Sequence, residues 1–174
     1  MNKAMRKHFT VTGFIVHKNK VALHWHKHVK KWLPPGGHIE MDEDPISAVH
    51  REVKEETGLN IQILSQLPYD YGTPLQLARP EAMAIYDMQS GDGTLKAVHQ
   101  HIDFIYFCAP EDGTLFGFQP DEWLWVDEKT IQRGKVVGLG YSAEIAQDVK
   151  ELSLEAIKRY KEKMILDMGQ GPRS

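Results

Sequence analysis

Cysteine is nearly absent from this sequence, because Cys108 is the only one in 174 residues. A single thiol cannot form a disulfide within the chain, and a protein without disulfides suits a reducing compartment. Cys108 lies in the apolar run of residues 104–109, which predicts a buried position in a strand. We therefore expect a cytoplasmic protein.

An excess of positive charge and long apolar runs are also missing. Lys and Arg total 21 against 24 Asp and Glu, which gives a net charge of -3. A chain of this charge has no overall cationic field to hold a nucleic-acid polymer or an anionic membrane, so an anionic substrate needs local cations or a bound metal. No apolar run approaches the roughly 18 residues of a membrane span. The sequence therefore argues against nucleic-acid polymers and membranes as partners.

Composition and the order of local signals indicate a compact domain. Apolar residues make up 41% of the chain and charged residues 26%, as in globular proteins with their own core. No internal repeat, low-complexity tract or linker divides residues 1–174, so we expect a single domain. β-branched and aromatic residues predict strands at residues 9–16, 21–25, 60–67, 81–88, 98–108 and 122–126, with turns at residues 72–74 and 90–93.

Two helices are predicted between and after these strands. The first begins at Asp44 and Pro45, an N-cap followed by a proline at the first helical position, and ends at Gly58. The second is a long amphipathic helix over residues 142–166, where apolar residues keep helical spacing. The mixed order of strands and helices favours an α/β/α sandwich.

Three glutamates gather on one face of the first helix. Glu52, Glu55 and Glu56 stand at i, i+3 and i+4, so their carboxylates converge within roughly 100° of arc, beside the apolar stripe that packs on the sheet. Lys54 lies well away from them and does not relieve their repulsion. A divalent cation such as Mg²⁺ would relieve it, because hard cations prefer carboxylate oxygens. The alternative is an ordinary solvated acidic face.

The residues around this cluster complete a longer pattern. It consists of Gly37, Glu43, Arg51, Glu52, Val53, Glu55, Glu56, Gly58 and Leu59. The segment resembles the Nudix box, G-x5-E-x7-R-E-U-x-E-E-x-G-U, in which U is a bulky aliphatic residue, and it matches every fixed position. The resemblance implies one Nudix hydrolase domain over residues 1–174, with a Nudix-like α/β/α sandwich and a mixed central sheet. It also implies hydrolysis of a nucleoside diphosphate linked to another group X, an acid anhydride, with Mg²⁺ or Mn²⁺.

The resemblance assigns roles to the residues of the box. It makes Glu52, Glu55 and Glu56 the metal ligands and adds the backbone carbonyl of Gly37. The reaction needs a carboxylate near the metal to take the proton of the attacking water, and Glu52 and Glu56 are the candidates.

Two further charged residues are assigned supporting parts. Arg51 is expected to orient the catalytic carboxylates rather than to react, through a charge-assisted hydrogen bond to Glu55 or to Glu43. Glu122, before the last predicted strand, is a reserve base or ligand, with a plain surface glutamate as the alternative.

An aromatic side chain near the glycines could stack on a nucleotide base. Trp32 precedes the Pro-Pro-Gly-Gly segment of residues 34–37 and is the candidate, with Tyr71 and Tyr86 as rivals. Core packing of Trp32 is the alternative interpretation.

Polar residues of another strand are predicted to reach the substrate. His99, His101 and Asp103 alternate along residues 98–108 and so share one face. We assign His101 and Asp103 to substrate binding, together with His38, which follows Gly37. Polar residues hydrogen-bonded beneath a loop are the alternative, and a metal site of histidine type is a weaker interpretation.

The sequence does not determine the identity of the group X in the substrate. An ADP-ribose-like sugar or a nucleoside triphosphate is the leading substrate, and a dinucleoside polyphosphate is the next candidate. Pro74 lies about 15 residues beyond the box, and in this the sequence weakly resembles ADP-ribose hydrolases, which carry a proline there. A catalytically inactive nucleotide-sensing regulator and an isoprenoid-diphosphate isomerase are the alternative functions. The partner is expected to be a small nucleotide, and a homodimer is left open.

Overall fold

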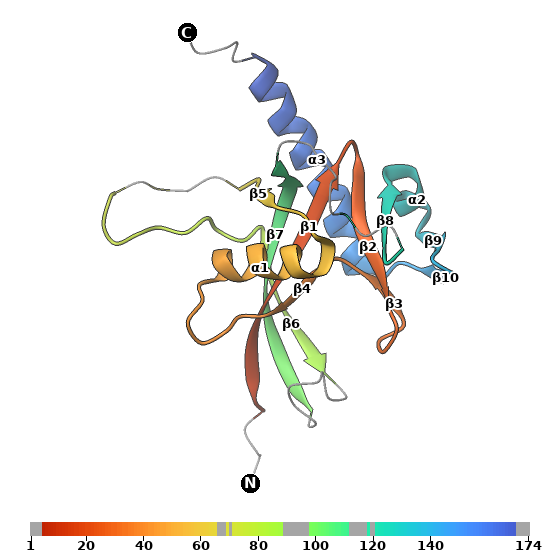
Figure 1. The fold of residues 1–174 in the computed structure, drawn as a ribbon, viewed down its shortest axis with the longest axis horizontal. Helices are drawn as coiled ribbons and strands as arrows, with labels where there is room; N and C mark the ends of the chain where they lie inside the picture. Colours follow the sequence, from red (N-terminus) through yellow and green to blue (C-terminus); the bar gives the residue numbers. More distant parts are fainter. Residues whose placement is uncertain are drawn as a thin grey trace.

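The computed structural model describes residues 5–65, 69, 71–88, 98–111, 118 and 121–169 (Figure 1). Its elements are β1 (Lys7–His17), β2 (Lys20–His26), β3 (Lys31–Leu33), β4 (Gly36–His38), α1 (Pro45–Thr57), β5 (Ile61–Ile63), β6 (Ala82–Met88), β7 (His99–Pro110), β8 (Trp123–Asp127), α2 (Glu128–Arg133), β9 (Lys135–Gly138), β10 (Tyr141–Glu144) and α3 (Gln147–Gly169). No helix in these ranges is both long and apolar enough to cross a membrane.

A mixed sheet forms the centre of the molecule. Its order is β3-β2-β1-β7-β5, and β4 pairs with β1, β6 with β7 and β8 with β2. The pairing of β1 with β7 is parallel, whereas β2 and β4 run antiparallel to β1. The predicted mixed central sheet is therefore confirmed.

Helices cover both faces of this sheet. On one face, Val49 and Val53 of α1 pack with Val11 and Ile15 of β1, and Cys108 of β7 lies fully buried among them, as predicted. On the other face, α3 contributes Val149 and Ile157 to a second cluster, which contains Phe14 and Phe107 of the sheet. Figure 1 shows α1 in front of β1 and β7, with α3 behind. The α/β/α layering follows from this alternation of inward residues.

The first helix has the predicted limits because its ends carry the right side chains. Asp44 caps α1, where its carboxylate accepts hydrogen bonds from the backbone N–H groups of Ile46 and Ser47. Gly58 ends the helix in the left-handed conformation, with φ of 77°, and its N–H donates to the carbonyl of Lys54.

Other elements differ from expectation. The long helix begins at Gln147 rather than at residue 142, because Tyr141–Glu144 pairs with β9 as strand β10. The short strands β3 and β4 and the helix α2 were not predicted. The predicted strand of residues 60–67 is shorter, since β5 covers Ile61–Ile63, and residues 66 and 67 lie outside the described residues. Residues 72–74 form a bend where a turn was predicted, whereas the predicted turn at residues 90–93 lies outside the described residues.

Candidate active site

Strand β4 brings a stretch of bare backbone against the glutamates of α1. A side chain at Gly37 would collide with the carboxylate of Glu52. The backbone N–H of Gly36 donates a 3.1 Å hydrogen bond to Oε2 of Glu56. Gly37 therefore leaves room for the Glu52 carboxylate of α1, whereas a side chain at Gly36 would collide with the carbonyl of Val11 in β1.

Arg51 links the carboxylates of this region. Its Nε and Nη2 donate to the two oxygens of Glu43, over 2.6 and 2.9 Å. Its Nη1 donates to Glu52 over 2.9 Å and to Glu55 over 3.2 Å, and Nη2 also reaches the carbonyl of His38 over 3.0 Å. The two contacts that the sequence offered as alternatives, to Glu43 and to Glu55, both form. The guanidinium thus orients three carboxylates and ties α1 to β4.

These contacts shift the protonation of the partners. The hydrogen bond from Arg51 lowers the pKa of Glu43 below its ordinary value. In turn, the hydrogen bonds to Glu43 and Glu52 raise the pKa of Arg51, so the guanidinium stays protonated.

Glu56 has a different environment from the other two glutamates. Burial raises its pKa to about 7, and the charges of Glu52 and Glu55 add to this shift, while the hydrogen bond from Gly36 opposes it. The indole N–H of Trp123 donates to the carbonyl of Glu56 over 2.8 Å, which anchors the end of α1 to β8. The ionised form of Glu56 is therefore disfavoured, first by burial and then by the charges of Glu52 and Glu55.

The donor set fits a hard divalent cation. Carboxylate oxygens and a backbone carbonyl are the ligands that Mg²⁺ and Mn²⁺ prefer, and the raised pKa of Glu56 marks a position where a cation would be favourable. In the described structure, however, Glu52 and Glu55 both face Arg51, and the three glutamates do not form a compact group of ligand atoms. Metal binding would thus need their carboxylates to turn away from the guanidinium.

The structure corrects the role that was predicted for Trp32. Its side chain is 0% exposed in the core beneath α3, where its ring meets the Trp25 ring edge-on at 5.4 Å. A side chain without exposed surface offers no face to a base, so the predicted stacking by Trp32 is wrong. Of its rivals, Tyr71 is exposed, and Tyr86 is partly buried with its hydroxyl donating to Asp148 of α3.

Asp103 is also more deeply placed than expected. It is 4% exposed and accepts hydrogen bonds from the hydroxyls of Thr10, over 2.8 Å, and Thr12, over 2.7 Å. Burial raises its pKa, and the two threonines partly offset this shift. Asp103 therefore holds β7 to β1 rather than lining an open pocket, which corrects its assignment to substrate binding. Glu122 is exposed immediately before β8, as its alternative interpretation as a plain surface glutamate expects.

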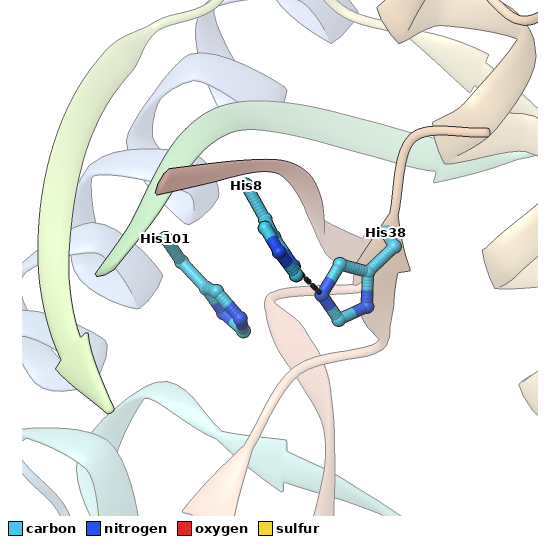
Figure 2. Close-up of side chains that lie close together, drawn as sticks. All are labelled: His8, His38 and His101. Atoms are coloured by element: carbon cyan, nitrogen blue, oxygen red, sulfur yellow. Dashed lines mark hydrogen bonds between the residues drawn. The ribbon is translucent and has the colours of Figure 1, made fainter. Parts of the chain in front are cut away.

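The two remaining candidate substrate-binding residues lie next to a third histidine that was not predicted from the sequence. His38 and His101 lie on one face of the sheet, and His8 of β1 lies between their strands (Figure 2). The ring nitrogens Nδ1 of His8 and Nε2 of His38 are 3.2 Å apart. The available signal was alternation: His8, Thr10 and Thr12 share one face of β1, but only the register places that face beside His101.

Comparison with known proteins identifies the family. A NUDIX domain model matches residues 6–138, well over half of the chain. The chain belongs to the Nudix family. A crystal structure of a NUDIX-family hydrolase from Clostridium perfringens is 32% identical and covers 87% of this chain and 96% of that one, with a TM-score of 0.66. This likeness confirms the predicted Nudix fold.

Curated relatives of this Nudix protein match over shorter spans. An RNA pyrophosphohydrolase from Bartonella henselae is 29% identical over 104 residues, which cover 58% of this chain and 59% of the relative. The m7GpppN-mRNA hydrolase NUDT17 of Danio rerio is 60% identical over 30 residues, 17% of this chain and 10% of the relative. The chain thus spans about three fifths or less of the length of these relatives.

Proposed function

We propose that this Nudix protein is a metal-dependent pyrophosphohydrolase, which cleaves the pyrophosphate linkage of a nucleoside diphosphate joined to another group X. The observation that carries the proposal is the network in which Arg51 joins Glu43, Glu52 and Glu55 while Glu56 lies against the bare backbone of β4. Such a network gathers several carboxylates where α1 meets β4, and Glu52 and Glu55 would turn from Arg51 to the ion when it binds.

The proposed division of roles follows from the chemistry of the linkage. Glu52, Glu55 and Glu56, with the carbonyl of Gly37, would hold Mg²⁺, or Mn²⁺ in its place. The bound ion would supply neutralisation of the phosphate oxygens and a lower pKa for the attacking water. A water oxygen then bonds to one phosphorus, the bridging P–O bond breaks, and the bridging oxygen leaves on the other phosphate.

The chain's own residues would accept the proton of the attacking water and position the carboxylates. Glu52 or Glu56 would accept the proton of the attacking water, and both lie where β4 meets α1. Arg51 would act by positioning, since its guanidinium already fixes Glu43 and holds the carbonyl of His38. His38 and His101 stay candidates for contact with a part of the substrate away from the metal, because their side chains project to the face of the sheet opposite to α1.

The substrate is proposed at the level of a class. An ADP-ribose-like sugar or a nucleoside triphosphate stays the leading choice, because a chain with a net charge of -3 suits a small anionic ligand better than a polymer. The similarity to RNA pyrophosphohydrolases favours the 5′ end of RNA as the second candidate. Such a substrate also contains the linkage that the proposed site would cleave.

A nucleotide panel tests this proposal. Full-length protein should be incubated with ADP-ribose, nucleoside triphosphates, dinucleoside polyphosphates and 5′-triphosphorylated RNA, each with Mg²⁺, with Mn²⁺ and with a chelator. We expect phosphorylated products that appear only with a metal ion. If no member of the panel is cleaved, the enzymatic proposal fails. Tight binding without products would indicate the sensing regulator, and conversion of isopentenyl diphosphate would indicate the isomerase.

A further inference from the structure

Three histidines from separate strands share one face of the sheet. In the register of β1 with β7, His8 pairs with His101, and in that of β1 with β4, Thr10 pairs with His38. Because paired residues and alternate residues project to the same side, the three imidazoles gather at one place. Gly13, an odd-numbered position of β1, packs on Val49 and Val53 of α1, so the histidines lie on the opposite face from α1 and its glutamates.

The distances between the rings suit coordination of one ion. One ring nitrogen from each of His8, His38 and His101 can be chosen so that all lie within 4.8 Å of one another. Tetrahedral Zn²⁺ with bonds of about 2.0 Å to nitrogen places neighbouring ligand atoms about 3.3 Å apart. Nδ1 of His8 and Nε2 of His38 share a hydrogen bond of 3.2 Å, which an ion would replace at nearly the same separation, and Figure 2 shows the His101 ring directed toward the same space. A modest rotation of His101 would complete the set.

The surroundings of the rings support binding rather than simple packing. All three histidines are partly buried, so strands hold them while one side stays accessible. Two residues before His101 on the same face of β7, fully buried His99 places its Nε2 3.1 Å from Nε2 of His101. A second imidazole in this position can fix the orientation and tautomer of a ligand, as partners behind metal-binding histidines commonly do.

We propose that His8, His38 and His101 form a site for a borderline-soft transition-metal ion such as Zn²⁺. Imidazole nitrogen suits Zn²⁺ and Co²⁺, whereas Mg²⁺ prefers oxygen, so this site and the glutamates select different ions. Three histidines leave a fourth position for water or a substrate oxygen, so the ion is compatible with a substrate contact here. The ion joins β1, β4 and β7, and its binding stabilises that part of the sheet.

Cobalt provides a direct probe that does not depend on hydrolysis. Metal-stripped, full-length protein is titrated with Co²⁺ in excess Mg²⁺, which competes for carboxylates but poorly for imidazoles. Four-coordinate Co²⁺ absorbs visible light far more strongly than six-coordinate Co²⁺ on oxygen ligands. We expect one equivalent to give the strong spectrum, and one equivalent of Zn²⁺ to abolish it and to raise Tm.

Substitutions locate the bound ion. His8→Asn and His101→Asn should each weaken Co²⁺ binding at least tenfold and remove the rise in Tm with Zn²⁺. His26→Asn and His28→Asn are matched controls, because these two rings lie near one another in a separate histidine pair, at 6.0 Å, and should leave binding unchanged. Binding that survives both cluster substitutions but is lost in Glu56→Gln would place the ion on the glutamates and overturn the proposal.

A measurement on the unaltered protein covers the case in which a variant does not fold. X-ray absorption of the zinc-loaded chain reports the atoms bound to the ion and the outer-ring scattering of imidazole. We expect three imidazoles in the first coordination shell. A shell of oxygen alone, or failure of the unaltered chain to bind zinc, would contradict the site even if the protein hydrolyses nucleotides with Mg²⁺.

Discussion

The ionised form of Glu56 that is proposed to bind a metal destabilises the metal-free protein. Burial and the neighbouring glutamates raise its pKa from 4.5 to about 7 in the folded chain. Because the folded-state pKa is the higher one, Glu56 favours the folded state at low pH, and this contribution is lost as the pH rises from about 4.5 through about 7. The metal-free protein should lose up to about 3 kcal/mol of unfolding free energy over that interval through this one group.

The first prediction is that Glu56→Gln stabilises the metal-free protein. Glutamine is neutral and can still accept the hydrogen bond from Gly36, so the variant should have a higher Tm than the unaltered protein at pH 8 and a similar Tm near pH 4.5. Thermal denaturation in chelator at both pH values measures this. Glu144→Gln is the control, because Glu144 is exposed on β10 and is not among the charges that raise the pKa of Glu56, so its removal should change the pH dependence little. The same pH dependence in Glu56→Gln as in the unaltered protein would contradict the assignment.

A second prediction concerns the geometry of Arg51. Lysine keeps the charge but cannot donate to Glu43, Glu52 and the His38 carbonyl together. Arg51→Lys should reduce turnover at least about tenfold and raise the Mg²⁺ concentration needed for half-maximal rate, with little change in Tm. Metal-dependent kinetics measure both effects. Arg133→Lys, at the exposed end of α2, should behave like the unaltered protein; equal kinetics for the two variants would remove Arg51 from a positioning role.

Strand β4 lies directly against Glu52 of α1 at Gly37. A methyl group at Gly37 would overlap the Glu52 carboxylate, so the third prediction is a specific interaction between these positions. Gly37→Ala should lower Tm, and combining it with Glu52→Ala should recover much of the loss, since the collision is gone. A double-mutant cycle from thermal or denaturant unfolding should show a coupling of at least about 0.5 kcal/mol. Simple additivity would mean that the two residues do not interfere.

Helix limits could be predicted where the chain itself carries the stop and start signals. Asp44, Pro45 and Gly58 define α1 through hydrogen bonds and backbone preferences that are local. The start of α3 could not be predicted, because the apolar spacing of residues 142–146 continues without interruption into a hairpin. The pairing of β10 with β9 decides that boundary, and pairing depends on contacts that helical periodicity does not report.

On the scale of the whole molecule, the glutamate–arginine network of α1 depends on local sequence, whereas the histidine cluster depends on strand pairing. The contacts among Glu43, Arg51 and Glu55 form within one short segment, so their spacing in the sequence was informative. His8 joins His101 only through the parallel register of β1 and β7, which no local pattern encodes. The burial of Trp32 likewise follows from the packing of distant elements, including α3, on its side of the sheet.

The most direct test of the central claim compares metal-dependent turnover in two glutamate variants. On the best substrate of the panel, Glu55→Gln should lower kcat/KM by about a hundredfold or more, because it removes a proposed metal ligand, while Glu122→Gln, exposed before β8, should keep nearly full activity. Both rates should fall to background in chelator. Turnover that persists without metal, or that is equal in Glu55→Gln and Glu122→Gln, would contradict hydrolysis by a metal ion held on α1.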